Sequence, residues 1–224
     1  MRGLLAALLL ALGPEAVAAP VPSFIADSAG TWLVATDDGR PGCRVALAAE
    51  RAGKAWRATP DAACAARLPA VARAVAWEYQ GGVRLLGPDG KVLLAFGEDE
   101  TTLLKTAFET PPVHFMVRAR AGVERAPHAP ALVGAWALRR PGGPVLCPLT
   151  LTRGAKEGET ELSLKTGTPC DPAVARLRLD TARVEDFTLM LYGKPETSLS
   201  FEPSGAESYA KTGGGKPLEM VRAP

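Results

Sequence analysis

Few residues in this sequence are able to carry out acid–base, nucleophilic or metal chemistry. The 224 residues include 2 His and 4 Cys. His114 lies in an apolar run and His128 in a Pro-rich stretch, and either imidazole is a candidate general base. Neither has a nucleophile beside it, and the motifs His-Glu-x-x-His and Gly-x-Ser-x-Gly do not occur. The sequence therefore favours a protein that is not an enzyme and holds no cofactor.

Three other polar segments have simple interpretations. Gly213–Lys216 (GGGK) is similar to a phosphate-binding loop, but it lacks the upstream Gly and is followed by Pro217, so we expect a turn. The charged stretches 98–100 and 156–159 are typical of solvated turns and are not expected to form paired catalytic carboxylates.

The four cysteines are candidates for disulfides or for a metal site. They fall two in each half of the chain, and no His stands at ligand spacing from any of them. An even count arranged this way favours one bridge per half, Cys43–Cys64 and Cys147–Cys170, and no metal site of the protein's own. In the chain-entropy treatment, each bridge contributes roughly 3 kcal/mol of stability.

The first 18 residues have the features of a signal peptide. Arg2 precedes the apolar run Gly3–Gly13, and Ala16-Val17-Ala18 offers small residues for cleavage. A buried N-terminal helix is the alternative. The run is too short to span a bilayer comfortably, so we expect no membrane span and a periplasmic or secreted protein that begins near Ala19. A net charge of +2 argues against a nucleic-acid partner.

An internal repeat organises the rest of the chain. Gly30-Thr31-Trp32 recurs as Gly134-Ala135-Trp136, and each Trp is followed eleven positions later by a Cys. We interpret Gly30, Trp32, Gly134 and Trp136 as structural, although each Trp could instead stack on a ligand. Between the copies, residues 119–131 (ARAGVERAPHAPA) are interpreted as a linker.

Each copy has the pattern of a small all-β domain. Short apolar runs alternate with turn signals such as Gly87-Pro88-Asp89-Gly90, which gives about eight strands in the first copy. So many strands in so short a chain remove their exposed edges best by closure. We therefore expect two tandem small eight-stranded antiparallel up-and-down β-barrels with one disulfide each, and a helical turn within residues 60–74.

The pattern of Gly30-x-Trp32, Cys43, Cys64, Trp77 and the hairpin closed by Phe96 resembles the alkaline proteinase inhibitor (Inh) family. The resemblance covers residues 20–118 well and residues 132–222 more loosely. It implies a bacterial periplasmic inhibitor of serralysin-type zinc metalloproteases, built as an eight-stranded barrel with one disulfide. The expected partner is thus a secreted zinc metalloprotease.

The resemblance also implies a mechanism in which the mature N-terminal segment enters the protease cleft. The residues that would bind the protease are Ala19, Pro20, Val21, Pro22 and Ser23, with Ala19 next to the zinc. The two prolines fix φ and reduce the entropy lost on binding. The expected division is a signal peptide at 1–18, an N-terminal trunk at 19–29, barrels at 30–118 and 132–224, and the linker at 119–131.

The chain departs from the family pattern in its second copy. That copy has no counterpart of Trp77, and its first strand follows the linker, so it has no free N-terminus. A different class of function also fits the sequence: a non-catalytic β-barrel that binds a small apolar ligand or a cell-envelope partner.

Overall fold

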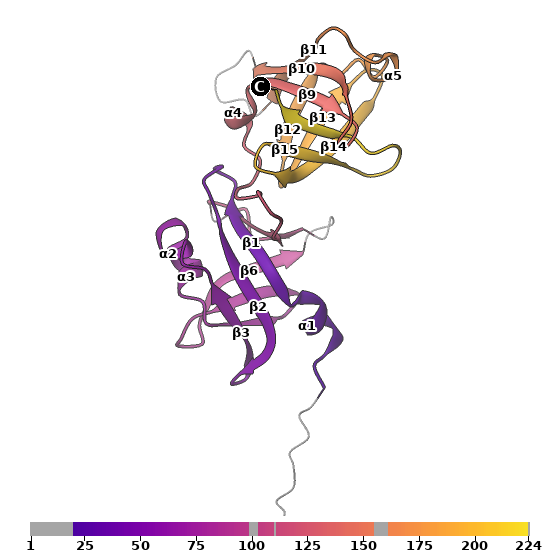
Figure 1. The fold of residues 1–224 in the computed structure, drawn as a ribbon. Coiled ribbons are helices and arrows are strands. Elements are labelled where there is room, and N and C mark those ends of the chain that lie inside the picture. Colours follow the sequence, from indigo (N-terminus) through magenta and orange to yellow (C-terminus); the bar gives the residue numbers. More distant parts are fainter. Residues whose placement is uncertain (1–19, 99–102, 110, 155–160, 224) are drawn as a thin grey trace, which may run out of the picture.

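The computed structural model describes residues 20–98, 103–109, 111–154 and 161–223. The proposed signal peptide and Ala19 lie outside the described residues, as do residues 99–100 of the first charged stretch and all of the second, 156–159. The chain forms two closed eight-stranded antiparallel barrels, one after the other (Figure 1). The sequence prediction of two tandem up-and-down barrels is confirmed.

In the first barrel each strand pairs with the next along the chain, and the last strand pairs with the first. Its strands are β1 (Gly30–Thr36), β2 (Cys43–Ala52), β3 (Ala55–Pro60), β4 (Ala76–Tyr79), β5 (Gly82–Leu86), β6 (Val92–Glu98), β7 (Leu104–Lys105) and β8 (His114–Arg118). β7 is shorter than the run 103–108 suggests, because the turn at Phe108 and the two prolines Pro111 and Pro112, which lack N–H donors, end the ladder.

The second barrel repeats this order, and its first strand again pairs with its last. Its strands are β9 (Gly134–Arg139), β10 (Val145–Arg153), β11 (Glu161–Thr166), β12 (Thr181–Glu185), β13 (Thr188–Gly193), β14 (Thr197–Gly205), β15 (Ser208–Thr212) and β16 (Glu219–Arg222). The disulfides Cys43–Cys64 and Cys147–Cys170 are present as predicted, one in each barrel.

In the part of the chain that the structure describes, five short helices accompany the strands. They are α1 (Ser23–Ser28), α2 (Cys64–Arg67), α3 (Pro69–Ala72), α4 (Ala129–Leu132) and α5 (Pro172–Ala175). α2 and α3 confirm the helical turn expected after β3. α1 and α4 occupy equivalent places, each directly before the first strand of its barrel.

Both barrel interiors are filled by side chains. Trp77 and Phe96 are buried in the core of the first barrel, and Phe201 is buried in the second. Trp77 pairs with Trp56 and Leu85 on the neighbouring strands. At the corresponding place in β12 the second barrel has Ala182, which pairs with two leucines on β11 and β13. The second copy therefore lacks a counterpart of Trp77 in structure as well as in sequence.

A third apolar cluster joins the two barrels. Leu33, Ala35 and Phe115 face outward from the first barrel, and Phe187 at the β12–β13 turn packs on them. The rings of Phe115 and Phe187 meet edge to face with centroids 6.0 Å apart. Lys105 forms an ion pair of 2.9 Å with Asp186 beside this cluster. The outer face of β1 is thus covered by the second barrel.

The segment 119–128 is packed against the first barrel on its way to the second. Val123 and Ala126 are buried in the cluster between the barrels. The Glu124 carboxylate accepts hydrogen bonds from Arg44 (2.7 Å) and from Arg67 (3.2 Å). The Arg44 hydrogen bond is the main cause that lowers the pKa of Glu124, and Arg67 adds to it. These contacts hold the connection against the first barrel.

Among the described residues, no helix has the length and apolar character needed to cross a membrane.

Candidate functional site

The exposed N-terminal segment begins at the described residues Pro20 and Val21 and leads into α1. Both side chains are exposed, with Val21 at 41%. In Figure 1 this segment leads away from the second barrel. The Pro22 carbonyl accepts hydrogen bonds from the amides of Ile25 (3.0 Å) and Ala26, which start the helix. Ser23, expected within the protease-binding segment, is the first residue of α1.

The first barrel holds α1 in place through one buried side chain and one ring contact. Ile25 is the buried residue of the helix and belongs to the barrel core. Phe24 remains 49% exposed, and its ring lies 5.6 Å from that of Tyr79 on β4. Burial of one large apolar side chain contributes about 1.5–3 kcal/mol. A six-residue helix, which is unstable alone, is thereby fixed to the barrel.

A second set of contacts fixes the end of α1, and we call it the Arg118 clamp (Trp32 and Arg118). The guanidinium of Arg118 donates hydrogen bonds to the carbonyls of Ala29 (2.6 Å) and Asp27 and lies 4.1 Å from the centre of the Trp32 ring. The indole N–H of Trp32 donates to the Ser28 carbonyl over 2.9 Å. Helix ends leave carbonyls without partners, and this clamp supplies donors for them.

Gly30 makes room for the Arg118 clamp. Its φ of +130° is a conformation that residues with side chains rarely adopt. A Cβ placed there would lie 2.6 Å from Nη1 of Arg118. The recurrence of Gly before Trp in both copies thus has a steric cause.

The second barrel contains the same arrangement, the Arg222 clamp (Trp136 and Arg222). Arg222 donates to the carbonyls of Val133 (3.0 Å) and Ala131 (2.7 Å) and lies 4.3 Å from the centre of the Trp136 ring. The Trp136 indole donates to the Leu132 carbonyl over 2.7 Å. The clamp is therefore part of the duplicated unit.

The two clamps hold chain segments of different exposure. The residues before α1 are exposed, whereas α4 follows the packed connection, in which Ala126 and Pro127 are buried. Trp136 is 2% exposed, while Trp32 is partly exposed. Only the first copy, within the described residues, presents a leading segment to solvent.

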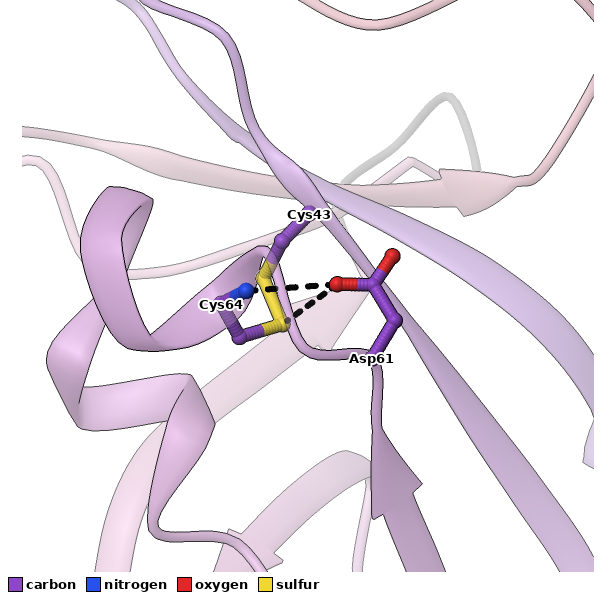
Figure 2. Close-up of side chains that lie close together, drawn as sticks. All are labelled: Cys43, Asp61 and Cys64. Atoms are coloured by element: carbon purple, nitrogen blue, oxygen red, sulfur yellow. Dashed lines mark hydrogen bonds between the residues drawn. A yellow bond between two sulfur atoms is a disulfide. The ribbon is translucent and has the colours of Figure 1, made fainter.

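One cluster in the first barrel has ligand types that metals use. Cys43, Asp61 and Cys64 bring their ligand atoms within 4.8 Å of one another (Figure 2). The two sulfurs are joined in a disulfide and are not available as thiolates. The Asp61 carboxylate instead accepts hydrogen bonds from the backbone amides of Cys64 and Arg44, each 3.2 Å long. The cluster fixes the disulfide loop and does not fit a metal ion.

The two histidines do not form a catalytic pair. His114 is half-buried on β8, and burial lowers the pKa of its imidazole, against the opposing effect of Asp37 and Asp38. His128 lies before α4, next to Gly39. Within the described residues, no hydrogen bond joins either imidazole to a Ser, Thr or Cys side chain. The turn at 213–216 is exposed between β15 and β16.

Arg118 and Arg222 were not among the residues predicted from the sequence, although the sequence contains a signal for them. The two arginines stand at the same distance after their respective tryptophans, so a full alignment of the two copies pairs them. Each arginine donates hydrogen bonds to backbone carbonyls that are distant in the sequence. No local sequence pattern indicates such contacts.

The fold and site define a disulfide-bonded double β-barrel that presents an anchored leading segment. Residues 25–111 match the family described as protease inhibitor Inh. The match falls within the first barrel, and the resemblance noted in the sequence is confirmed there. The second barrel repeats the architecture but is not included in this match. No curated protein and no solved structure matches the chain.

The matched family is one of protease inhibitors, so the match relates the first barrel to protease inhibition. Two disulfides are also typical of proteins from oxidising compartments.

Proposed function

We propose that this protein inhibits secreted zinc metalloproteases of the serralysin type by inserting its mature N-terminal segment, Ala19–Ser23, into the protease cleft. The observation that carries the proposal is the exposed segment at Pro20 and Val21, which leads through Pro22 into a helix held by a buried Ile25 and by the Arg118 clamp. The Inh match over residues 25–111 supports inhibition of a protease.

The proposed mechanism needs a leading segment that costs little entropy to order. Pro22 has φ −58°, which its ring enforces, and Pro20 restricts the chain in the same way. The anchored α1 removes the rotational freedom of the base of the segment. Binding then spends less free energy on ordering the chain than binding of a free peptide would.

The proposal assigns the α-amino group of Ala19 to the zinc of the protease. An amine binds a metal only when it is unprotonated. The ordinary pKa of an α-amino group is about 7.7–8.0. Inhibition is therefore expected to weaken as the pH falls below this range. This mechanism also requires that residues 1–18 act as a signal peptide and that the mature protein is periplasmic or secreted.

The second barrel has no equivalent leading segment in this proposal. The chain before α4 is the packed connection, held by Glu124 and by burial of Val123 and Ala126. The alternative function, a barrel that binds a small apolar ligand, has less support because core side chains such as Trp77 and Phe201 occupy the two interiors.

The test is titration of a purified serralysin-type protease with three forms of the mature protein. The first starts at Ala19, the second lacks Ala19–Ser23, and the third carries two additional residues before Ala19. We expect inhibition by the first alone. Equal inhibition by the extended protein would refute the terminal-amine mechanism, and no inhibition by the first would refute the protease class.

A further inference from the structure

A cleft with a volume of about 810 Å³ lies between the two barrels. One wall comes from α1 and the first barrel, and the other from the β12–β13 turn and β14 of the second barrel. Its first wall includes Phe24, Asp27 and Trp32, which belong to the element that carries the leading segment and to its clamp. The cleft therefore lies directly beside α1, where the leading segment is attached to the barrel.

The charge of the cleft is predominantly negative. Five carboxylates line it against two guanidiniums. The carboxylates are those of Asp27, Glu98, Glu185, Asp186 and Glu202, and the guanidiniums are those of Arg118 and Arg120.

Both guanidiniums are already engaged by the protein. Arg118 is held by two backbone carbonyls, and Arg120 pairs with Glu202 over 3.1 Å and donates to the Pro203 carbonyl. Asp186 is neutralised by Lys105. In contrast, Asp27, Glu98 and Glu185 form no ion pair with any residue that the structure describes. These three carboxylates leave a net negative site.

Apolar rings lie beside these carboxylates. Phe24 and Tyr79 form a ring pair at the first wall, and the Tyr79 hydroxyl donates to Glu98 over 3.1 Å. Phe24 is 49% exposed. Aromatic faces next to carboxylates bind the long side chains of Lys and Arg, because the rings contact the alkyl stem and the carboxylates the charged end.

We infer that this cleft receives a basic surface segment of the target protease, one that carries Lys or Arg side chains, as a second contact beside the leading segment. The inference rests on the proposed function. A target whose active site holds Pro20–Pro22 has its rim beside α1, and α1 is itself a wall of the cleft. The second barrel then contributes Glu185 to recognition although it has no leading segment of its own.

The test uses the full-length mature protein with Asp27→Asn, Glu98→Gln and Glu185→Gln combined. The matched control changes Glu50, Asp89 and Glu196 to their amides, three carboxylates that do not line the cleft, so the net charge changes equally. We expect the cleft variant to bind the protease roughly tenfold or more weakly, mainly through slower association and with a flatter dependence on salt. The control should change affinity less than about twofold.

Two outcomes separate the inference from the proposed function. If deletion of Ala19–Ser23 abolishes inhibition while the cleft and control variants bind alike, the proposed function holds and the second contact is refuted. If the wild-type protein inhibits no zinc protease, the proposed function and the second contact are both refuted. Asp27→Asn alone, at an exposed position in α1, provides a variant whose folding is not in question.

Discussion

Replacement of Arg118 by Ala tests how the first barrel directs its leading segment, and Arg222→Ala is a control supplied by the duplication. Each arginine donates to two carbonyls at the end of a short helix and covers a Trp ring. The clamp contacts are alike, although Arg222 also forms an ion pair of 3.4 Å with Glu207. Pro20 and Val21 before α1 are exposed, whereas the chain before α4 is packed.

The cost in stability is expected to be similar for the two variants. A hydrogen bond to a charged group contributes about 1.5–3 kcal/mol when it is buried. Arg118 is solvent-exposed, so we take about 1 kcal/mol for each of its two bonds and roughly 0.5 kcal/mol for the contact with Trp32. Chemical denaturation should show a loss of roughly 2.5 kcal/mol for Arg118→Ala and a loss of at least this size for Arg222→Ala, which also loses the ion pair with Glu207.

The effect on inhibition is expected to differ between them. Without the clamp, Asp27 and Ala29 are released at the base of the segment, and ordering a residue costs about 1–2 kcal/mol. Two released residues correspond to a loss of affinity of roughly 30-fold or more. The inhibition constant should therefore rise for Arg118→Ala and stay within about twofold of wild type for Arg222→Ala.

Two further variants complete this experiment. Arg118→Lys keeps the charge but not the two-pronged geometry, so it should recover only part of the affinity. In the protein that lacks Ala19–Ser23, the additional change Arg118→Ala should not alter the affinity for the protease further. If Arg222→Ala weakened inhibition as much as Arg118→Ala, the clamp would act through general stability and the reasoning would be wrong.

Three other predictions concern stability. Trp77→Ala should lower the free energy of unfolding by about 3–5 kcal/mol, measured by urea titration, because it leaves a cavity and removes the bond from the indole to the Ala48 carbonyl; a loss below 1 kcal/mol would contradict this core assignment. Glu124 has a folded pKa below its ordinary value, so its contribution is present above the unfolded pKa and is lost as the pH falls through the folded one; Glu124→Gln should flatten the pH dependence of stability between about pH 5 and pH 3, and an unchanged slope would contradict the pairing with Arg44. Replacing both Cys147 and Cys170 by Ser should cost roughly 3 kcal/mol in thermal unfolding yet leave inhibition at room temperature unchanged, whereas lost inhibition by the folded variant would contradict a purely stabilising role of this disulfide.

The strands were predictable because each barrel alternates apolar and polar residues between strong turn signals. β5 and β6 flank Gly87–Gly90 as the sequence indicates, and the even distribution of cysteines gave the correct pairs. These features depend on local patterns and on a repeat, both of which are visible in one sequence.

The contacts between the barrels were not predictable in the same way. Leu33 and Ala35 belong to a short apolar run, and such a run does not tell which element covers the outer face of a strand. Val123 and Ala126 lie in an irregular segment without apolar periodicity, so no sequence pattern indicates that these two side chains are buried. The helix α1 was missed because six residues after Pro22 carry too weak a helical signal, and tertiary contacts with Ile25 and Arg118 decide its structure.

The packed connection before α4 has a consequence for the number of targets that one molecule engages. Two barrels suggest a bivalent inhibitor, but Ala126 and Pro127 are covered, and the proposed mechanism acts through an uncovered chain start. One chain should then saturate its target at one molar equivalent. Further duplication of the barrel within the same polypeptide would enlarge the scaffold without raising this valency.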